Sequence, residues 1–80
     1  MNNQKKIFIT IAEVLEIKKS LINENSSSDT LKNWDSLAMI NIIIELEKKF
    51  NVKFNALEIA NLQSLKIIKE TLRKKGVRFD

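Results

Sequence analysis

The feature of this sequence that most restricts its fold is the scarcity of residues that break helices. The 80 residues include no proline and a single glycine, Gly76, close to the C-terminus. Tight strand turns depend on these two residue types, because they adopt backbone angles that other residues avoid. We therefore expect helices joined by polar loops, in a single domain that spans residues 1–80.

The core of so short a chain has to be built from aliphatic and aromatic side chains. A domain of 80 residues lies near the lower limit at which burial alone gives a stable fold. The sequence has no cysteine, so neither a disulfide nor a thiolate metal site can add stability. Ile, Leu, Val and Phe must therefore supply the core.

The N-terminal segment lacks the pattern of a signal peptide or a membrane anchor. No apolar run approaches the roughly 20 residues that span a bilayer. After Lys5 and Lys6, the apolar residues are interrupted at Thr10 and Glu13. The lack of cysteine also fits a reducing compartment. We expect a cytoplasmic protein that does not insert into a membrane.

Apolar residues at steps of three and four predict four helices. They are predicted over about residues 3–18, 36–50, 56–60 and 64–75. Gly76 is expected to end the last helix, because a glycine readily takes the left-handed conformation found there. The predicted class is all-α, with a long loop between the first two helices and a short third helix.

The faces of three predicted helices give candidate core residues. One face of the first helix carries Ile7, Phe8, Ile11, Val14 and Leu15. One face of the last helix carries Leu65, Ile68 and Leu72. The third helix is expected to bury Leu57 or Ile59. Basic residues are expected in the last turns of two helices, where they complement the helix dipole. They are Lys18 and Lys19 in the first helix and Arg73, Lys74 and Lys75 in the last.

The second helix has more apolar surface than one buried stripe requires. Its core face is predicted to hold Met39, Ile43, Leu46 and Phe50. Ile42 lies at one margin of this face, and Leu37, Ile40 and Ile44 lie at the other. Two interpretations remain open: the helix is central and has neighbours on two sides, or the second margin is a docking patch.

Residues 20–35 are predicted to be a loop, which is long for a compact domain and often functional at such a length. The run Ser26-Ser27-Ser28 is interpreted as a low-complexity linker. Four apolar residues are expected to anchor the loop on the helices: Leu21, Ile22, Leu31 and Trp34.

The residue types present argue against catalysis by this chain. It has no histidine and no cysteine, which removes the commonest general base and the best nucleophile. Glu45 and Glu47 lie two residues apart on a helix and point to different faces. There is no glycine-rich phosphate loop and no carboxylate cluster with metal-ligand spacing. We expect a protein that is not an enzyme and has no metal site.

Ser36 is the candidate functional residue. It lies where the long loop meets the second helix, with Asp35 predicted as the N-cap. A phosphodiester on a serine at this position would lie at the positive end of the helix dipole. A simpler interpretation is that Asp35 caps the helix and Ser36 is an ordinary first-turn residue.

A wider pattern around Ser36 resembles the acyl carrier protein family. It runs Ser28-x-Thr30-Leu31-x-x-Trp34-Asp35-Ser36-Leu37, then an aliphatic helix ending in Glu45-Leu46-Glu47-Lys48-Lys49-Phe50, then Val52-x-Phe54. The predicted helices before and after this segment also fall where that family has them. The resemblance covers essentially the whole chain and implies a four-helix bundle of the acyl carrier protein type.

The resemblance implies a cofactor and a set of partner enzymes. A phosphopantetheinyl transferase would attach 4′-phosphopantetheine from coenzyme A to Ser36, and Asp35 would help to place a magnesium ion in that complex. A ligase would then load an acyl or aminoacyl group as a thioester on the terminal thiol. A downstream acyltransferase or synthase would take the cargo, and the chain itself would be a monomer.

In that family, partner enzymes dock on the second helix. The corresponding positions here are Leu37, Ala38, Ile40, Asn41, Ile44, Glu45 and Lys48, with Lys49 beside them. Typical fatty-acid carriers have acids at several of these positions, whereas this chain is basic, with a net charge of +4. We therefore expect a specialised carrier with its own partners rather than the housekeeping carrier of fatty-acid synthesis.

The sequence leaves the cargo and two rival functions open. Family members often hold the acyl chain between the second and third helices, where Ile40, Ile43, Phe54, Ile59 and Leu62 could line a cavity or simply form the core. The net charge also raises nucleic-acid binding, although the basic residues scatter along the chain and Trp34 is the only aromatic residue expected near the surface. An unmodified interaction module is the other alternative.

Overall fold

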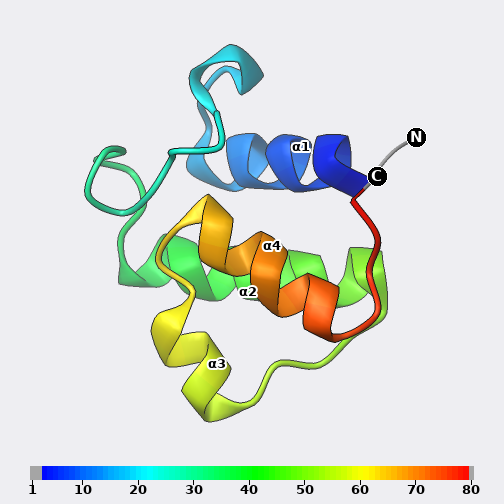
Figure 1. Cartoon of the computed structure of the whole chain (residues 1–80). Coiled ribbons are helices and arrows are strands. Elements are labelled where there is room, and N and C mark those ends of the chain that lie inside the picture. Colours follow the sequence, from blue (N-terminus) through cyan, green and yellow to red (C-terminus); the bar gives the residue numbers. More distant parts are fainter. Residues whose placement is uncertain (1–2, 80) are drawn as a thin grey trace.

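The computed structural model describes residues 3–79 and confirms the all-α class. Its elements are α1 (Asn3–Leu15), the short 3-10 helix η1 (Lys19–Leu21), α2 (Ser36–Phe50), α3 (Ala56–Asn61) and α4 (Leu65–Lys74) (Figure 1). No strand forms in the described residues beyond an isolated bridge between Ser27 and Ser64. None of the helices within these residues is long and apolar enough to cross a bilayer.

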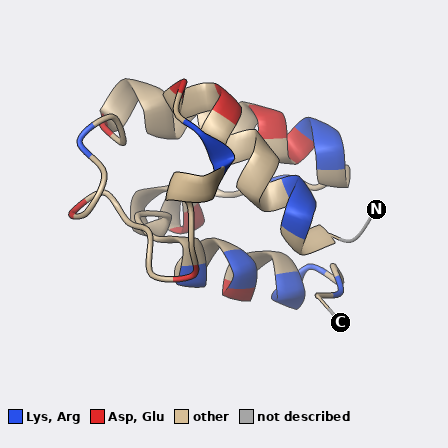
Figure 2. Cartoon of the chain, turned by 90° about the horizontal axis from the view of Figure 1, so that it is seen from above, with Lys and Arg blue, Asp and Glu red and all other residues tan. Residues whose placement is uncertain are grey.

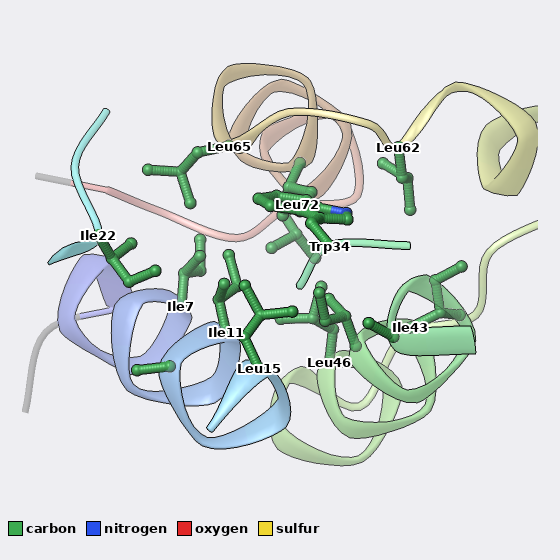
Figure 3. Close-up of a cluster of buried hydrophobic side chains, with 14 of the residues drawn as sticks. Ile7, Ile11, Leu15, Ile22, Trp34, Ile43, Leu46, Leu62, Leu65 and Leu72 are labelled. Carbon is green, nitrogen blue, oxygen red and sulfur yellow. The ribbon is translucent and has the colours of Figure 1, made fainter. Parts of the chain in front are cut away.

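Three helices meet in one apolar core (Figure 3). Its fully or almost fully buried members are Ile7, Ile11 and Leu15 from α1, Ile42, Ile43 and Leu46 from α2, and Leu65, Ile68 and Leu72 from α4. The predicted core face of the last helix is thus confirmed, and that of the first helix is confirmed except that Phe8 and Val14 are only half-buried. The Cα radius of gyration is 11.3 Å, close to the value of about 11.6 Å expected for a compact domain of this length.

The first helix is shorter than predicted. It ends at Leu15 rather than at about residue 18, because Glu16 takes a left-handed backbone conformation with a φ of 56°. The carbonyl oxygen of Leu15 accepts a hydrogen bond from the side-chain amide of Asn33 at 3.1 Å. Lys18 and Lys19 therefore lie beyond the helix, and the prediction that they occupy its last turn is wrong.

The buried face of α2 is rotated from the predicted one. Ile43 and Leu46 are buried as expected, but Met39 and Phe50 are only half-buried, and Ile42 has no exposed surface. This rotation turns Ile42 into the core, against the neighbouring helices. Phe50 lies partly outside, where its ring centroid is 5.7 Å from the Lys6 Nζ atom of α1.

The loop before α2 is held to the α3–α4 junction by its backbone. The carbonyl oxygen of Ser26 accepts a hydrogen bond from the Leu65 amide, and the Ser28 amide donates to the Gln63 carbonyl, both at 2.9 Å. Ser26 is also buried, and its hydroxyl accepts a hydrogen bond from the amide of Asn23. The interpretation of these serines as a linker is wrong, because the backbone fixes them in place.

The loop is anchored by fewer side chains than predicted. Ile22 and Trp34 are buried and Leu31 is half-buried, whereas Leu21 lies exposed in η1. The prediction for Leu21 is therefore wrong. Part of the expected loop is also helical, since η1 occupies residues 19–21.

The third helix has polar anchors rather than an apolar one. None of its side chains is buried, and Leu57 is 74% exposed, so the prediction that Leu57 or Ile59 enters the core is wrong. A capping box joins Asn55 and Glu58, each backbone N–H donating to the other side chain. Glu58 also pairs with Lys75 at 2.8 Å. Leu62, which follows the helix, is fully buried in their place.

We expect the Glu58 contacts to make stability depend on pH. The Lys75 ammonium and the Asn55 N–H hold the pKa of Glu58 below its ordinary value of 4.5. A lowered folded-state pKa gives stability that is present above the unfolded-state pKa and is lost as the pH falls through the folded value. Glu58→Gln should therefore destabilise the domain near neutral pH, and the difference from wild type should shrink below pH 4.5.

Urea midpoints measured across this pH range test the expectation. Glu70→Gln, which replaces an exposed acid on α4, serves as the control. A difference between Glu58→Gln and wild type that stays constant from neutral to acid pH would contradict the assigned ion pair.

Candidate functional site

Ser36 is exposed at the first position of α2, as predicted. The Asp35 carboxylate caps the helix: its Oδ1 atom accepts a hydrogen bond from the Ala38 N–H at 2.9 Å. The backbone carbonyl of Asp35 accepts the next one, from Met39, also at 2.9 Å. Asp35 is an extended residue with a φ of −104° and a ψ of −172°, as is usual for an N-cap.

This geometry leaves the start of α2 suited to an anionic group. The first N–H groups of a helix have no partner within the helix, and Asp35 satisfies only the one at Ala38 by its side chain. No other described residue forms a hydrogen bond with the Ser36 hydroxyl. A phosphate ester on this oxygen would meet solvent, free N–H groups and the positive end of the dipole.

Trp34 fixes the approach to this site. Its amide donates to the carbonyl of Leu31 at 3.0 Å, closing a turn, and its indole ring lies in the core with 3% of its surface exposed. The neighbouring Asn33 is tied to the end of α1. The expectation that Trp34 lies near the surface is wrong, whereas its expected role as an anchor is confirmed.

A hollow of about 390 Å³ opens beside Ser36, between α2, α3 and the loop. It is lined by Ser28, Trp34, Asp35, Ser36, Met39, Ile40, Ile59, Ala60 and Gln63. Of the residues predicted to line a cavity, Ile40 and Ile59 do so. Ile43, Phe54 and Leu62 are buried in the core instead.

An exposed apolar strip continues from Ser36 along α2. Leu37, Ile40 and Ile44 are 69%, 54% and 44% exposed, and their spacing places them on one side of the helix. Asn41, Lys48 and Lys49 are exposed near them, and Glu45 is half-buried and pairs with Lys48 at 3.8 Å. Ala38 is different: it is buried with the core, so its place in the predicted docking patch is wrong.

Basic residues recur along α4 (Figure 2). The helix α4 alone carries Lys66, Lys69, Arg73 and Lys74, with Glu70 as its one acid. Lys69 is already engaged, since its Nζ atom lies 3.0 Å from both Gln4 Oε1 and Glu24 Oε1. A large share of the basic residues thus lies on α4 rather than on α2.

Sequence reasoning did not place five residues in the lining of the hollow: Trp34 and Met39, which it assigned other roles, and Ser28, Ala60 and Gln63. Ser28 and Gln63 meet because of the backbone bonds between the loop and the α3–α4 junction, and no residue pattern signals those bonds. Within residues 3–79, no group of three acidic side chains forms a metal site.

Neither a family model nor a curated protein matches this chain. The assignment of function therefore depends on the residues of the site.

Proposed function

We propose that this chain is an acyl carrier protein with the four-helix bundle of that family, and that Ser36 carries 4′-phosphopantetheine. The observation that carries the proposal is the exposed Ser36 hydroxyl at the start of a capped helix, with a hollow and an apolar strip next to it. An ordinary first-turn serine needs neither of these neighbours.

The residues present fit the cofactor. The Ser36 oxygen is open to an enzyme that transfers the group from coenzyme A, and the helix start favours the phosphate that results. When attached, phosphopantetheine supplies the thiol that carries an acyl or aminoacyl group as a thioester. The chain supplies attachment, orientation and recognition, and the partner enzymes supply the catalysis.

The strip formed by Leu37, Ile40 and Ile44 is the proposed docking surface for those enzymes. Asn41 and Lys48 border it, and Glu45 beside it is paired with Lys48 at 3.8 Å, so this surface offers basic docking sites less negative charge than a row of acids would. The partners are therefore a dedicated ligase and acyltransferase whose contact surface is apolar or acidic. Free exchange of the loaded protein with ordinary fatty-acid synthesis enzymes would contradict this choice of partners.

Intact mass after incubation with a broad-specificity phosphopantetheinyl transferase, coenzyme A and magnesium tests the proposal. We expect an increase by one phosphopantetheine group, and none when coenzyme A is omitted. A folded protein that gains no mass would instead favour an unmodified interaction module, which would use the same apolar strip.

Asp35 is expected to matter for loading beyond its role as a cap. Asn caps a helix about as well as Asp does, because its side-chain oxygen also accepts an N–H. Asp35→Asn should therefore keep the fold but remove the carboxylate that helps to place magnesium in the transferase complex. We expect loading to slow by roughly 10–100-fold, as when a group supporting a metal site is lost.

Rates of mass increase at several magnesium concentrations, together with circular dichroism, measure this effect. An unchanged rate in Asp35→Asn would show that Asp35 acts only as a cap.

A further inference from the structure

The indole N–H of Trp34 is the one buried side-chain polar group in the described part of the chain that has no hydrogen-bond partner. Only 3% of the surface of Trp34 is exposed. Tryptophan N–H groups in a protein interior usually find an acceptor, because burying a donor without one is unfavourable. An orphan donor of this kind needs an explanation.

Its location suggests one. Trp34 contributes to the lining of the hollow beside Ser36, together with Asp35 and Ser36 themselves. In Figure 3 the indole nitrogen lies at the end of the ring nearer Leu62, a fully buried core residue that directly precedes Gln63 of the lining in the chain. The unpaired donor therefore belongs to a residue that lines the hollow beside Ser36, although its nitrogen is covered.

The nitrogen is covered in this structure, so an acceptor reaches it only when covering side chains move. The lining allows such movement. Met39 is unbranched and has three rotatable bonds, so it adapts to a new neighbour easily. Ile59 belongs to α3, which buries none of its side chains and is held by polar contacts instead.

We propose that the Trp34 indole N–H donates a hydrogen bond to an oxygen atom of the group tethered to Ser36. This inference rests on the proposed function. The acceptor is a carbonyl or hydroxyl oxygen, which comes either from an amide of the phosphopantetheine arm or from the acyl cargo. Where the cargo is the source, a plain alkyl chain would leave the donor unpaired, so a cargo with an oxygen along its chain is preferred.

Trp34 is the only tryptophan of the chain, so its indole N–H gives a single signal in a ¹⁵N–¹H correlation spectrum. The spectrum is recorded for four forms of the wild-type protein: unmodified, with phosphopantetheine, with an alkyl acyl thioester, and with a hydroxyacyl thioester of equal length. Hydrogen-bond formation moves the indole proton downfield. A shift on attachment of phosphopantetheine identifies the arm as the source of the acceptor, and a shift only with the hydroxyacyl form identifies the cargo.

Trp34→Phe provides the second measurement, since it keeps an aromatic ring and removes the donor. In the wild type, the form whose attached group shifts the indole signal should have a higher melting temperature than the form whose attached group does not. This difference should vanish in Trp34→Phe. If the variant does not fold, the spectra of the wild type decide alone.

An indole signal that stays in place in all four forms overturns the inference while the proposed function stands, because the mass increase has already shown modification. A protein that the transferase does not modify overturns both.

Discussion

Replacing Ser36 by alanine is expected to abolish phosphopantetheine loading completely and to leave the fold unchanged. Ser36 is exposed and its hydroxyl has no hydrogen-bond partner among residues 3–79, so its loss removes no hydrogen bond. The change in the free energy of unfolding should lie within about 0.5 kcal/mol, as for other surface substitutions. Intact mass after the transferase reaction measures loading, and urea denaturation measures stability.

Ser64→Ala is the matched control, since Ser64 also lies at the start of a helix. Its hydroxyl caps α4 by accepting a hydrogen bond from the Ile67 N–H at 3.2 Å. Loss of this cap should cost about 0.5–2 kcal/mol and leave loading intact. Ser36→Ala is thus expected to lose loading but not stability, and Ser64→Ala to lose stability but not loading. Loading that survives in Ser36→Ala would move the attachment to another residue and remove the basis of the proposed function.

Leu46→Ala should lower the free energy of unfolding by about 2–5 kcal/mol. Leu46 has no exposed surface and lies in the core that α1, α2 and α4 share. Its truncation removes buried apolar surface and leaves a cavity that a close-packed interior fills only in part. Small domains have about 5–15 kcal/mol in total, so this loss is a large fraction of the stability. Urea denaturation followed by circular dichroism measures it.

Ile44→Ala, two residues away on the same helix, controls for helix propensity and side-chain size. Ile44 belongs to the exposed strip, so its truncation should change the free energy of unfolding by no more than about 0.5 kcal/mol. Equal losses in the two variants would mean that the buried face of α2 has been assigned incorrectly.

The sequence predicts the helices of this domain better than it predicts which residues they bury. The start of α2 follows from Asp35 and the stop of α4 from Gly76, because both residues have strong local preferences. The end of α1 carries no such signal: Glu16 takes a left-handed conformation that side chains rarely adopt. Likewise, no local pattern reveals that Ile42 rather than Phe50 faces the core.

The sequence likewise predicts some residues of the candidate site and not others. Ser36 and Asp35 are predicted because their chemistry and position are local. The hollow beside them needs the backbone bonds that join Ser26 and Ser28 to Leu65 and Gln63, which connect residues more than thirty positions apart in the chain. Burial of Ala38 depends on the direction in which α2 is turned, and composition does not specify that direction.

These backbone bonds also determine how the domain fluctuates. A protein opens locally at segments with few buried contacts, and amide hydrogens exchange with solvent through such openings. The Ser28 and Leu65 amides are hydrogen-bonded across the loop junction, so they should exchange slowly, although Ser28 lies in a loop. The amides of α3, which buries no side chain, should exchange faster. We therefore expect the wall of the hollow that α3 forms to fluctuate more than the wall that the loop forms.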